Sequence, residues 1–527
     1  MKISIKIAAL IFCLSGIFSA SYAQQQKRKS VIFKIDGQNK AQFIENFGAA
    51  GCWFSEGIGK FWPDEKKEQI AEWLFSRSFD KNGNPSGIGL SAWRFNIGGG
   101  TAEQGDNSGI KDFRKRVESF QNPDGTYDWE KQAGYVWFVR KAKSYGVENL
   151  IAFSNTPPVH FTQNGYGFKT EKDYKSNLKV DKYGAYAGFL ADVINHFDAE
   201  NLHFNYISPV NEPQWDWSNK PGEASQEGSP WQNEEIYKVA NALDSALTTR
   251  KLTSKIMLTE AGMLNYLYAG SGQANRQIQN FFGKSSQLEL RNLNHMADFI
   301  GGHSYFTDNG DSSIIQVRKN VADTTRKYDI KFWQTEYSML ADGFREGEKG
   351  KRSAIDCALF LAKLIHNDLT VANASAWQLW NSLEPGSPDF DTRYYLIALK
   401  PNEKHTDGEY FQTKGLWAYG NFSRFIRPGM QRLAVDRSDN LTDLQAAQDL
   451  MLSAYTDHHG KTIVVAINYT GNEKSVRLEL KNLGKARKVK RYLTSAAEKD
   501  NLKSYPEQKL TDSILLPARS VTTMVVE

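Results

Sequence analysis

The chain has 527 residues and a formal net charge of +5, which is small for that length. An N-terminal leader would take two lysines and no acidic residue with it, which leaves a charge of +3 on the mature chain. A chain this close to neutrality gives no reason to expect nucleic acid or an acidic membrane surface as a partner. Roughly 500 residues suffice for one large domain and a smaller one.

The first residues are typical of a signal peptide. Two lysines supply a positive region, residues 7–18 an apolar core, and Ser21-Tyr22-Ala23 a cleavage site with small residues on both sides of the tyrosine. We expect residues 1–23 to be removed and the mature chain to begin at about Gln24, as a secreted or periplasmic protein. No later segment approaches the roughly 20 apolar residues of a membrane helix, so we expect no membrane insertion.

The mature chain keeps two cysteines, Cys52 and Cys357. Two are too few for a disulfide framework, although export would permit a bridge. Cys357 lies in a predicted amphipathic helix, and Cys52 follows a predicted strand. This placement favours two free thiols over a disulfide.

From about Ile44 to Leu399, short apolar strands alternate with amphipathic helices, which predicts parallel strands joined by helical crossovers. For example, one apolar helical face runs from Tyr186 to Phe197 and is followed at once by a strand. The eight predicted strands are Ile44–Ala50, Leu90–Asn96, Leu150–Asn155, Phe204–Val210, Ile256–Glu260, Phe299–His303, Phe332–Glu336 and Ala374–Leu379. Eight strands with helices between them predict an α/β fold of the (β/α)8 TIM-barrel type, in which functional groups project from the carboxyl ends of the strands.

A doubly wound sheet is the alternative to the barrel. Such a sheet usually carries a glycine-rich phosphate loop after its first strand. Gly98-Gly99-Gly100 follows the second strand and lacks the G-x-G-x-x-G spacing, so we expect no dinucleotide.

After about Glu409 the pattern becomes β-rich, with turns such as Asp457-His458-His459-Gly460 and no strong helix. Predicted strands are 462–468, 476–480, 489–493 and 520–526, and residues 31–35 are expected to pair with them. We therefore expect residues 44–405 to form the barrel, and residues 24–43 together with 406–527 to form an antiparallel β-sandwich side domain.

Two short motifs each place a glutamate at or just after the end of a predicted strand. They are Ser208-Pro209-Val210-Asn211-Glu212-Pro213 at strand four and Phe332-Trp333-Gln334-Thr335-Glu336-Tyr337 at strand seven. Two facing carboxyl groups are what cleavage of a glycosidic bond requires, because one protonates the leaving group and the other captures the oxocarbenium-like centre. For Asn211-Glu212-Pro213 alone, a helix start is the alternative, since asparagine caps helices and proline is tolerated in the first turn.

With these motifs, the sequence resembles glycoside hydrolase family 30, which belongs to a clan of retaining barrel hydrolases, over essentially the whole mature chain. The resemblance rests on Asn211-Glu212-Pro213, Thr335-Glu336-Tyr337, His303-Ser304-Tyr305 and, most specifically, the string from Gly420 to Gly429. Within the family, Gln214-Trp215-Asp216-Trp217 and Ser225-Gln226-Glu227-Gly228 look most like the endo-β-1,6-galactanase-like branch.

The resemblance implies that Glu212 is the general acid/base and Glu336 the nucleophile. An acid must keep its proton near neutral pH, and burial or a nearby negative charge achieves this by raising its pKa. A nucleophile must stay ionised, and Arg94, at the end of strand two, is the candidate for supporting its charge. Asn211, beside the acid, suits a hydrogen bond to a sugar 2-hydroxyl group.

Other residues at the same ends of the strands are expected to contact the substrate. His303 would bond the substrate or the nucleophile, with a purely structural role as the alternative. Tyr305, Tyr337 and Trp377 would line the floor of the sugar site, as would Trp380, or else pack inside the barrel. Glu260, after strand five, would bind a hydroxyl group or form an ion pair, and we expect no catalytic role for it.

The sequence departs from the family pattern in two places. Where many relatives have a tryptophan after strand three, this chain has Asn155, and after strand six a frequent tryptophan becomes Ser304. Both changes remove an aromatic platform near the site. Asn155 also offers hydrogen bonds to the substrate, so we expect a larger or more polar pocket.

The expected function is that of a secreted retaining β-glycoside hydrolase, with β-1,6-galactan as the preferred polysaccharide on the resemblance alone. β-1,6-Glucan, xylan and terminal β-galactosides or β-fucosides are the alternative substrates. A non-catalytic glycan-binding protein is the alternative of another class. No metal or other cofactor is expected, because the sequence has no His-Glu-x-x-His pair and the mechanism needs none. The sugar, endo or exo action and the oligomeric state stay open.

Overall fold

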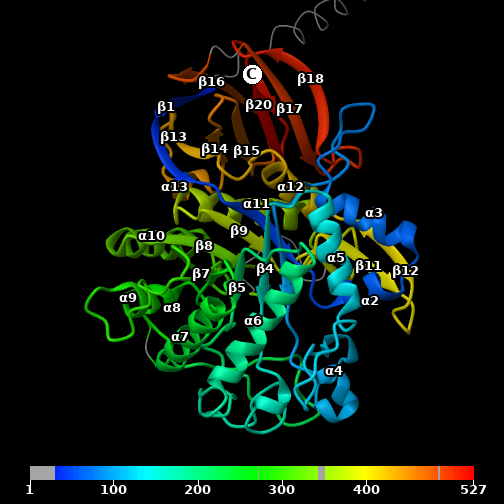
Figure 1. Ribbon diagram of the computed structural model, residues 1–527. Coiled ribbons are helices and arrows are strands. Elements are labelled where there is room, and N and C mark those ends of the chain that lie inside the picture. Colours follow the sequence, from blue (N-terminus) through cyan, green and yellow to red (C-terminus); the bar gives the residue numbers. More distant parts are fainter. Residues whose placement is uncertain (1–29, 271, 342–350, 485–486) are drawn as a thin grey trace, which may run out of the picture.

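The computed structural model describes residues 30–270, 272–341, 351–484 and 487–527. The predicted leader, residues 1–23, and Gln24 lie outside the described residues. The chain forms a parallel barrel surrounded by helices and, at one end of it, a mostly antiparallel sheet domain that carries the C-terminus (Figure 1). The expected fold class is therefore confirmed.

Eight parallel strands form the barrel in the order β6-β5-β4-β3-β2-β9-β8-β7. They are β2 (Asn46–Ala50), β3 (Ala92–Asn96), β4 (Asn149–Phe153), β5 (Tyr206–Ser208), β6 (Lys255–Ile256), β7 (Phe299–His303), β8 (Lys331–Glu336) and β9 (Ala376–Leu379). Backbone hydrogen bonds from Ala297 to Ile256 (3.0 Å) and from Gly301 to Leu258 (2.6 Å) join β6 to β7 and close the barrel. β5 and β6 end earlier than predicted, because the chain turns there and holds Glu212 and Glu260 at positive φ.

Helices cover the outside of the barrel. The longer ones are α2 (Phe54–Phe61), α3 (Asp64–Phe75), α5 (Ala133–Ser144), α6 (Tyr183–Ala199), α7 (Asn233–Thr249), α9 (Gln277–Phe282), α10 (Asp311–Tyr328), α11 (Ala354–Thr370) and α12 (Lys414–Ser423). The short ones are α4 (Thr101–Gln104), η1 (Gly105–Ser108), η2 (Phe113–Lys115), η3 (Val159–Phe161), α8 (Asn265–Tyr268) and α13 (Asp443–Ala446). The apolar face predicted for α6 is buried, including Tyr186 and Phe197.

α12 lies in the part of the chain after Glu409 where the sequence predicted no strong helix. α12 follows a small sheet of β10 (Leu383–Pro385), β11 (Ile397–Pro401) and β12 (Gly408–Gln412). The Thr413 side chain caps it by accepting a hydrogen bond from Leu416 N at 3.2 Å. Every residue from Gly415 to Ser423 is buried, so α12 lacks the polar face that reveals a helix in a sequence.

The second domain is a nine-stranded sheet in the order β18-β17-β20-β15-β14-β13-β1-β16-β19. Its strands are β1 (Val31–Phe43), β13 (Gln431–Arg437), β14 (Leu450–Thr456), β15 (Thr462–Asn468), β16 (Lys474–Lys481), β17 (Lys488–Ser495), β18 (Lys503–Lys509), β19 (Ile514–Leu516) and β20 (Ser520–Val526). β1 pairs antiparallel with β13 and parallel with β16, so residues 31–35 enter this sheet. The sheet folds over on itself, because Phe33 and Val476 share an apolar core with Val464.

β14, β15 and β20 are buried on both faces. In β15, Val464 faces the sandwich core, whereas Ile463, Val465 and Ile467 pack into the apolar cluster of the barrel. α11 and α12 lie between the barrel and this sheet (Figure 1). An apolar contact therefore joins the two parts. The domain boundaries at residues 43/44 and 405/406 remain a proposal.

Cys52 and Cys357 are both buried and free, as expected. None of the helices in the described part of the chain has the length and apolar character needed to cross a bilayer.

Candidate active site

A cavity of about 490 Å³ lies at the carboxyl ends of the barrel strands. Its volume is in the usual range for sites that bind small ligands, about 300 to 1,000 Å³. Aromatic side chains form much of its wall, and the carboxyl groups of Glu212, Glu336 and Glu384 face it. Both glutamates of the two sequence motifs thus line one cavity.

Glu336, the last residue of β8, has a donor on each carboxylate oxygen. Arg94 Nη1 lies 2.6 Å from Oε2, and the Tyr305 hydroxyl group donates to Oε1 at 3.0 Å. Arg94 is fully buried, with its guanidinium 4.4 Å from the centre of the Phe153 ring. A buried charge is tolerated only when it is paired, so Arg94 and Glu336 depend on each other.

Glu212 lies just after β5 in the left-handed region of the backbone, with φ of 44°. Its N–H donates to the carbonyl oxygen of Glu260 at 2.8 Å, which ties the two loops together. Within the described residues no lysine or arginine pairs with its carboxyl group, and its charged partner is His303, whose Nδ1 lies 3.0 Å from Oε1. Burial raises the pKa of Glu212, and His303 opposes this effect only in part. Asn211-Glu212-Pro213 forms a turn rather than a helix start.

Glu260, just after β6, is fully buried beneath the two motif glutamates. It accepts hydrogen bonds from His303 Nε2 at 2.9 Å and from the Thr335 hydroxyl group at 2.5 Å, and Arg94 Nη2 lies 3.3 Å away. Although burial would raise the pKa of Glu260, the charges of Arg94 and His303 lower it to about 2. Glu260 is therefore an anion that positions both cations of the site.

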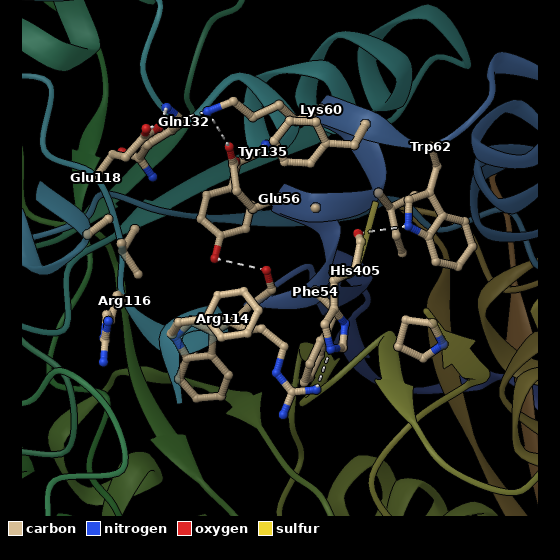
Figure 2. A pocket seen from close by; sticks show the side chains of 18 of the residues that line it. Phe54, Glu56, Lys60, Trp62, Arg114, Arg116, Glu118, Gln132, Tyr135 and His405 are labelled. Carbon is tan, nitrogen blue, oxygen red and sulfur yellow. Dashed lines mark hydrogen bonds and ion pairs between the residues drawn. The ribbon is translucent and has the colours of Figure 1, made fainter. Parts of the chain in front are cut away.

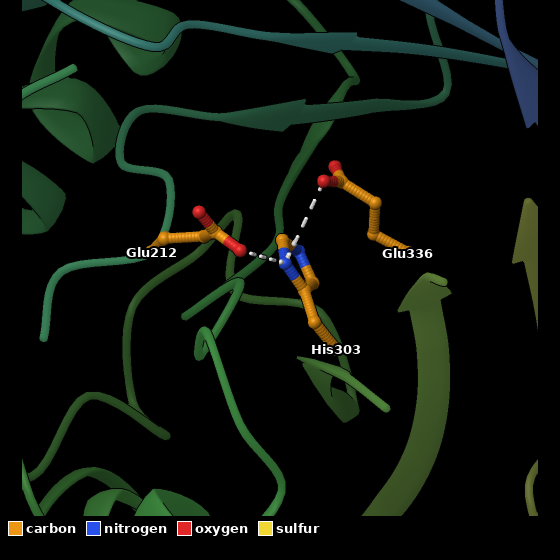
Figure 3. A group of neighbouring side chains, drawn as sticks. All are labelled: Glu212, His303 and Glu336. Atoms are coloured by element: carbon orange, nitrogen blue, oxygen red, sulfur yellow. Dashed lines mark hydrogen bonds and ion pairs between the residues drawn. The ribbon is translucent and has the colours of Figure 1, made fainter. Parts of the chain in front are cut away.

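His303 bridges the carboxyl groups. Figure 3 shows the His303 ring between Glu212 and Glu336. Its Nδ1 lies 3.0 Å from Glu212 and 3.8 Å from Glu336, and its Nε2 faces Glu260. Burial alone would lower the pKa of His303, but the surrounding carboxyl groups, chief among them Glu336, raise it to about 10. A doubly protonated ring donates from both nitrogen atoms, which matches these contacts.

The charges of this cluster balance when one carboxyl group keeps a proton. Arg94 and His303 carry two positive charges, which offset the negative charges of Glu260 and Glu336. Glu212 is then the neutral member, in agreement with its raised pKa. One oxygen of Glu212 and one of Glu336 lie within 4.8 Å of each other. This spacing suits a retaining pair, about 5 to 5.5 Å, and is too short for an inverting pair, about 6.5 to 9.5 Å.

Glu212, His303 and Glu336 also form a group whose donor atoms are close enough to ligate one metal ion. A histidine ligates metals through a neutral ring nitrogen. Both nitrogen atoms of His303 instead lie within hydrogen-bond distance of carboxyl groups, Nδ1 of Glu212 and Nε2 of Glu260. The chemistry of this group fits an ion-pair network better than a metal site.

Comparison with known proteins places this site in a family. The family model of the O-glycosyl hydrolase family 30 matches residues 30–391. The chain belongs to glycoside hydrolase family 30. It is therefore a glycosidase.

Individual relatives agree with this assignment. A solved conserved exported protein from Bacteroides fragilis is 36% identical, with a TM-score of 0.86 over 94% of this chain and 100% of that chain. A glucuronoxylanase, XynC, from Bacillus subtilis is 23% identical over 88% of this chain and 92% of its own length. A solved endo-β-1,6-glucanase is 16% identical, with a TM-score of 0.63 over 94% of both chains, which shows a shared fold alone.

The other residues expected to bind substrate lie at different depths in this family 30 hydrolase. Asn155 and Asn211 line the cavity, and Asn211 Nδ2 donates to Asn155 Oδ1 at 3.0 Å. Tyr305 also lines the cavity. Arg94 and His303 are fully buried, do not line the cavity, and instead contact the carboxyl groups of Glu336 and Glu212.

Tyr337 and Trp377 are a correction to the expected sugar floor. Both are fully buried behind the cavity wall. The Tyr337 hydroxyl group donates to Asp308 at 2.7 Å, and Trp377 Nε1 donates to Asp368 at 2.8 Å. Their polar atoms are thus occupied by the interior of the barrel. Trp380, three residues further on, does line the cavity.

Several cavity residues were not predicted to bind substrate. They are Trp53, Lys115, Phe306, Ser338, Leu340, Glu384 and Tyr394. Most of them lie in loops of irregular length, and no spacing rule connects such loops to the site. The sequence indicates only that such loops follow barrel strands, and every loop after a barrel strand lies at the carboxyl face of the barrel, where the active cavity is.

Proposed function

We propose that this family 30 hydrolase is a retaining β-glycosidase in which Glu336 is the nucleophile and Glu212 the general acid/base. The unequal surroundings of the two carboxyl groups carry the proposal. Glu336 has an arginine and a tyrosine hydroxyl group as donors, which suits an ionised nucleophile. Glu212 is buried, unpaired with any described lysine or arginine and raised in pKa, which suits an acid.

The reaction would proceed in two displacements. In the first, Glu336 attacks the anomeric carbon, the bond to the leaving oxygen breaks, and the proton of Glu212 passes to that oxygen. In the second, Glu212 accepts a proton from water, the water oxygen attacks the anomeric carbon, and Glu336 leaves as a carboxylate. The cluster keeps its charge balance throughout, because Glu212 becomes an anion as Glu336 becomes a neutral ester. Little reorganisation of Arg94 and His303 is then needed.

We propose β-1,6-galactan as the substrate. The two strings that resemble the galactanase-like branch supply residues of the active cavity, since Trp215, Trp217 and Gln226 line it. Asn155 offers hydrogen bonds where many relatives have a tryptophan. β-1,6-Glucan and xylan are the alternatives, in view of the glucanase and glucuronoxylanase among the relatives.

Product analysis tests both parts of this proposal. Purified protein is incubated with β-1,6-galactan, β-1,6-glucan and xylan, and the anomer first released is followed by proton NMR. We expect the β-anomer first and the highest kcat/KM on galactan. Initial release of the α-anomer would refute the nucleophile assignment, and faster cleavage of glucan or xylan would refute the substrate.

A variant test separates catalysis from binding. Glu336→Gln should lose at least about 10³-fold in kcat while still binding the polysaccharide, because the glycosyl ester of Glu336 cannot form. Glu409→Gln is the matched control, since Glu409 is an exposed glutamate of β12. Equal activity of the two variants would contradict the proposed role of Glu336. Binding without any turnover in the wild type would instead favour a glycan-binding protein.

We also propose that the protein is exported after cleavage before Gln24. The apolar N-terminal segment and the exported relative from Bacteroides fragilis support this. N-terminal sequencing of the protein from culture medium or periplasm should begin at Gln24. An intact Met1 on the protein recovered from cells would refute cleavage.

A further inference from the structure

Under the proposed function, one side of the active cavity binds the leaving group and the opposite side binds the transferred sugar. Glu212 must reach the leaving oxygen, so the leaving group lies on its side of the cavity. Trp215, Trp217 and Phe306 follow β5 and β7 there. The sugar unit that is transferred to Glu336 must then lie on the opposite side, where the loops after β2, β3 and β9 form the wall.

That opposite side carries an aromatic surface. Trp53 and Trp380 both line the cavity and contact each other edge to face, with ring centres 5.0 Å apart. The apolar face of a pyranose ring packs well on such aromatic groups. Its polar edge then needs hydrogen-bonding partners, because polar groups that lose water without a partner reduce affinity.

Lys115 and Glu384 are the charged side chains on this side. Lys115 Nζ lies 4.7 Å from the centre of the Trp53 ring, and no carboxylate of the described chain pairs with it within ion-pair distance. Glu384 lies in β10, with Lys115 and the Asn381 amide near its carboxyl group. Burial raises the pKa of Glu384 to about 7, an effect that Lys115 and Asn381 oppose. Near neutral pH this carboxyl group can both accept and donate hydrogen bonds.

The neighbouring cation is engaged elsewhere. Arg114 lines a second cavity (Figure 2), which has a volume of about 290 Å³ and shares Trp53 with the active cavity. Its Nε donates to Asp112 at 2.7 Å, and Nη1 lies 3.2 Å from Nε2 of His405. Lys115 is therefore the cation of this loop that faces the active cavity.

We propose that Lys115 and Glu384 bind the oxygen atoms at C4 and C6 of the transferred sugar, so that the site selects a hexopyranosyl unit over a pentopyranosyl unit. The reason is geometric and rests on the proposed function. With C1 held at Glu336, C4 and the C6 branch lie at the far end of the ring, which is the end that meets the loops after β3 and β9. A xylosyl unit lacks C6 and leaves one of these charged groups without a partner.

Aryl β-glycosides test this assignment in the full-length mature protein. The probes are the 4-nitrophenyl β-galactoside, its 6-deoxy analogue (the β-fucoside), its 4-deoxy analogue and the β-xyloside. We expect the wild type to cleave the galactoside with the highest kcat/KM. Lys115→Met and Glu384→Gln should each lower that value by about 10- to 100-fold, as loss of a hydrogen bond to a charged group does. On the deoxy analogue that lacks the oxygen atom bound by the substituted residue, kcat/KM should fall less than about threefold. The two changes are then non-additive, because an interaction that is already absent cannot be lost again.

Matched controls exclude general damage. Lys111→Met removes an exposed lysine of the same loop, and Glu409→Gln an exposed glutamate beside β11. Both should keep wild-type rates, and all variants should melt at the wild-type temperature within a few degrees.

Three results would overturn the inference. They are equal losses on the galactoside and on both deoxy analogues, wild-type rates in both site variants, and a wild type that prefers the xyloside or cleaves no hexoside. None of these would affect the proposed nucleophile, because that proposal fails only if Glu336→Gln stays active or the product anomer is inverted.

Discussion

The buried cluster of Arg94, Glu260 and Glu336 offers a sharp test of how the site is held. Arg94→Met removes the cation that lies 2.6 Å from Glu336 and 3.3 Å from Glu260. Two carboxylates then face each other with His303 as their remaining cation. Removing one partner of a buried ion pair costs about 3–5 kcal/mol, so we expect a loss of stability of that size. The activity should fall further, because Glu336, the proposed nucleophile, loses a charge-assisted hydrogen bond worth about 1.5–3 kcal/mol, or about 10- to 150-fold in kcat/KM.

A second substitution should partly restore stability without restoring activity. Glu260→Gln alone also destabilises the protein, since it leaves the cations with less negative charge. In Arg94→Met combined with Glu260→Gln, the uncompensated buried carboxylate is gone. We expect this double variant to be at least about 1 kcal/mol more stable than the sum of the single losses predicts. Its kcat/KM should stay low, because Glu336 still lacks Arg94.

Urea unfolding measures the stability of the four proteins, and hydrolysis of the galactoside measures their activity. Arg318→Met is the matched control, because Arg318 is an equally buried arginine whose Nε pairs with Asp368 at 2.8 Å outside the cavity. It should cost similar stability but far less activity per folded molecule. Additive stability losses in the double variant would refute the coupled cluster, and restored activity would refute the direct support of Glu336.

Three further predictions concern single groups. Burial raises the pKa of Glu212, so kcat/KM should fall as the pH rises through that pKa. On substrates with activated leaving groups, Glu212→Gln should abolish this fall on the basic side of the pH profile. If the fall persisted, the assignment of Glu212 as the acid would be contradicted. Tyr305→Phe removes a hydrogen-bond donor that lies 3.0 Å from Glu336. It should lower kcat/KM about 10- to 100-fold and leave the melting temperature unchanged. An unchanged kcat/KM would show that this hydrogen bond does not contribute to catalysis. The pKa of Glu260 lies near 2 in the folded chain, against an ordinary value of 4.5. The ionised Glu260 therefore contributes its full stabilisation above about pH 4.5, and this stabilisation is lost as the pH falls towards 2. Glu260→Gln should flatten the acid side of a plot of melting temperature against pH.

Much of the fold could be predicted because it depends on local patterns. Predicted and observed strands coincide at 299–303, 462–468 and 520–526, and the second of these contains a continuous apolar run, residues 463–467. β15 could be predicted although apolar and polar residues do not alternate along it. Val464 and Ile467 contact different apolar cores, so both faces of the strand require apolar residues. α12 could not be predicted in the same way, since burial on all sides removes the polar face that marks a helix.

The sequence by itself determined the two motif glutamates, their strands and the barrel that brings strand ends together, because strand periodicity and short motifs are properties of neighbouring residues. Only the tertiary structure decided which groups surround each glutamate. Arg94 and Glu260 meet Glu336 and His303 across the barrel, and the resulting charge balance supports the proposal that Glu212 is the acid and Glu336 the nucleophile. Tyr337 and Trp377 were indistinguishable from substrate contacts in the sequence, and burial of their polar atoms against Asp308 and Asp368 removes them from the site. Electrostatic environment and burial depend on residues that are distant in the chain, so no local pattern carries them.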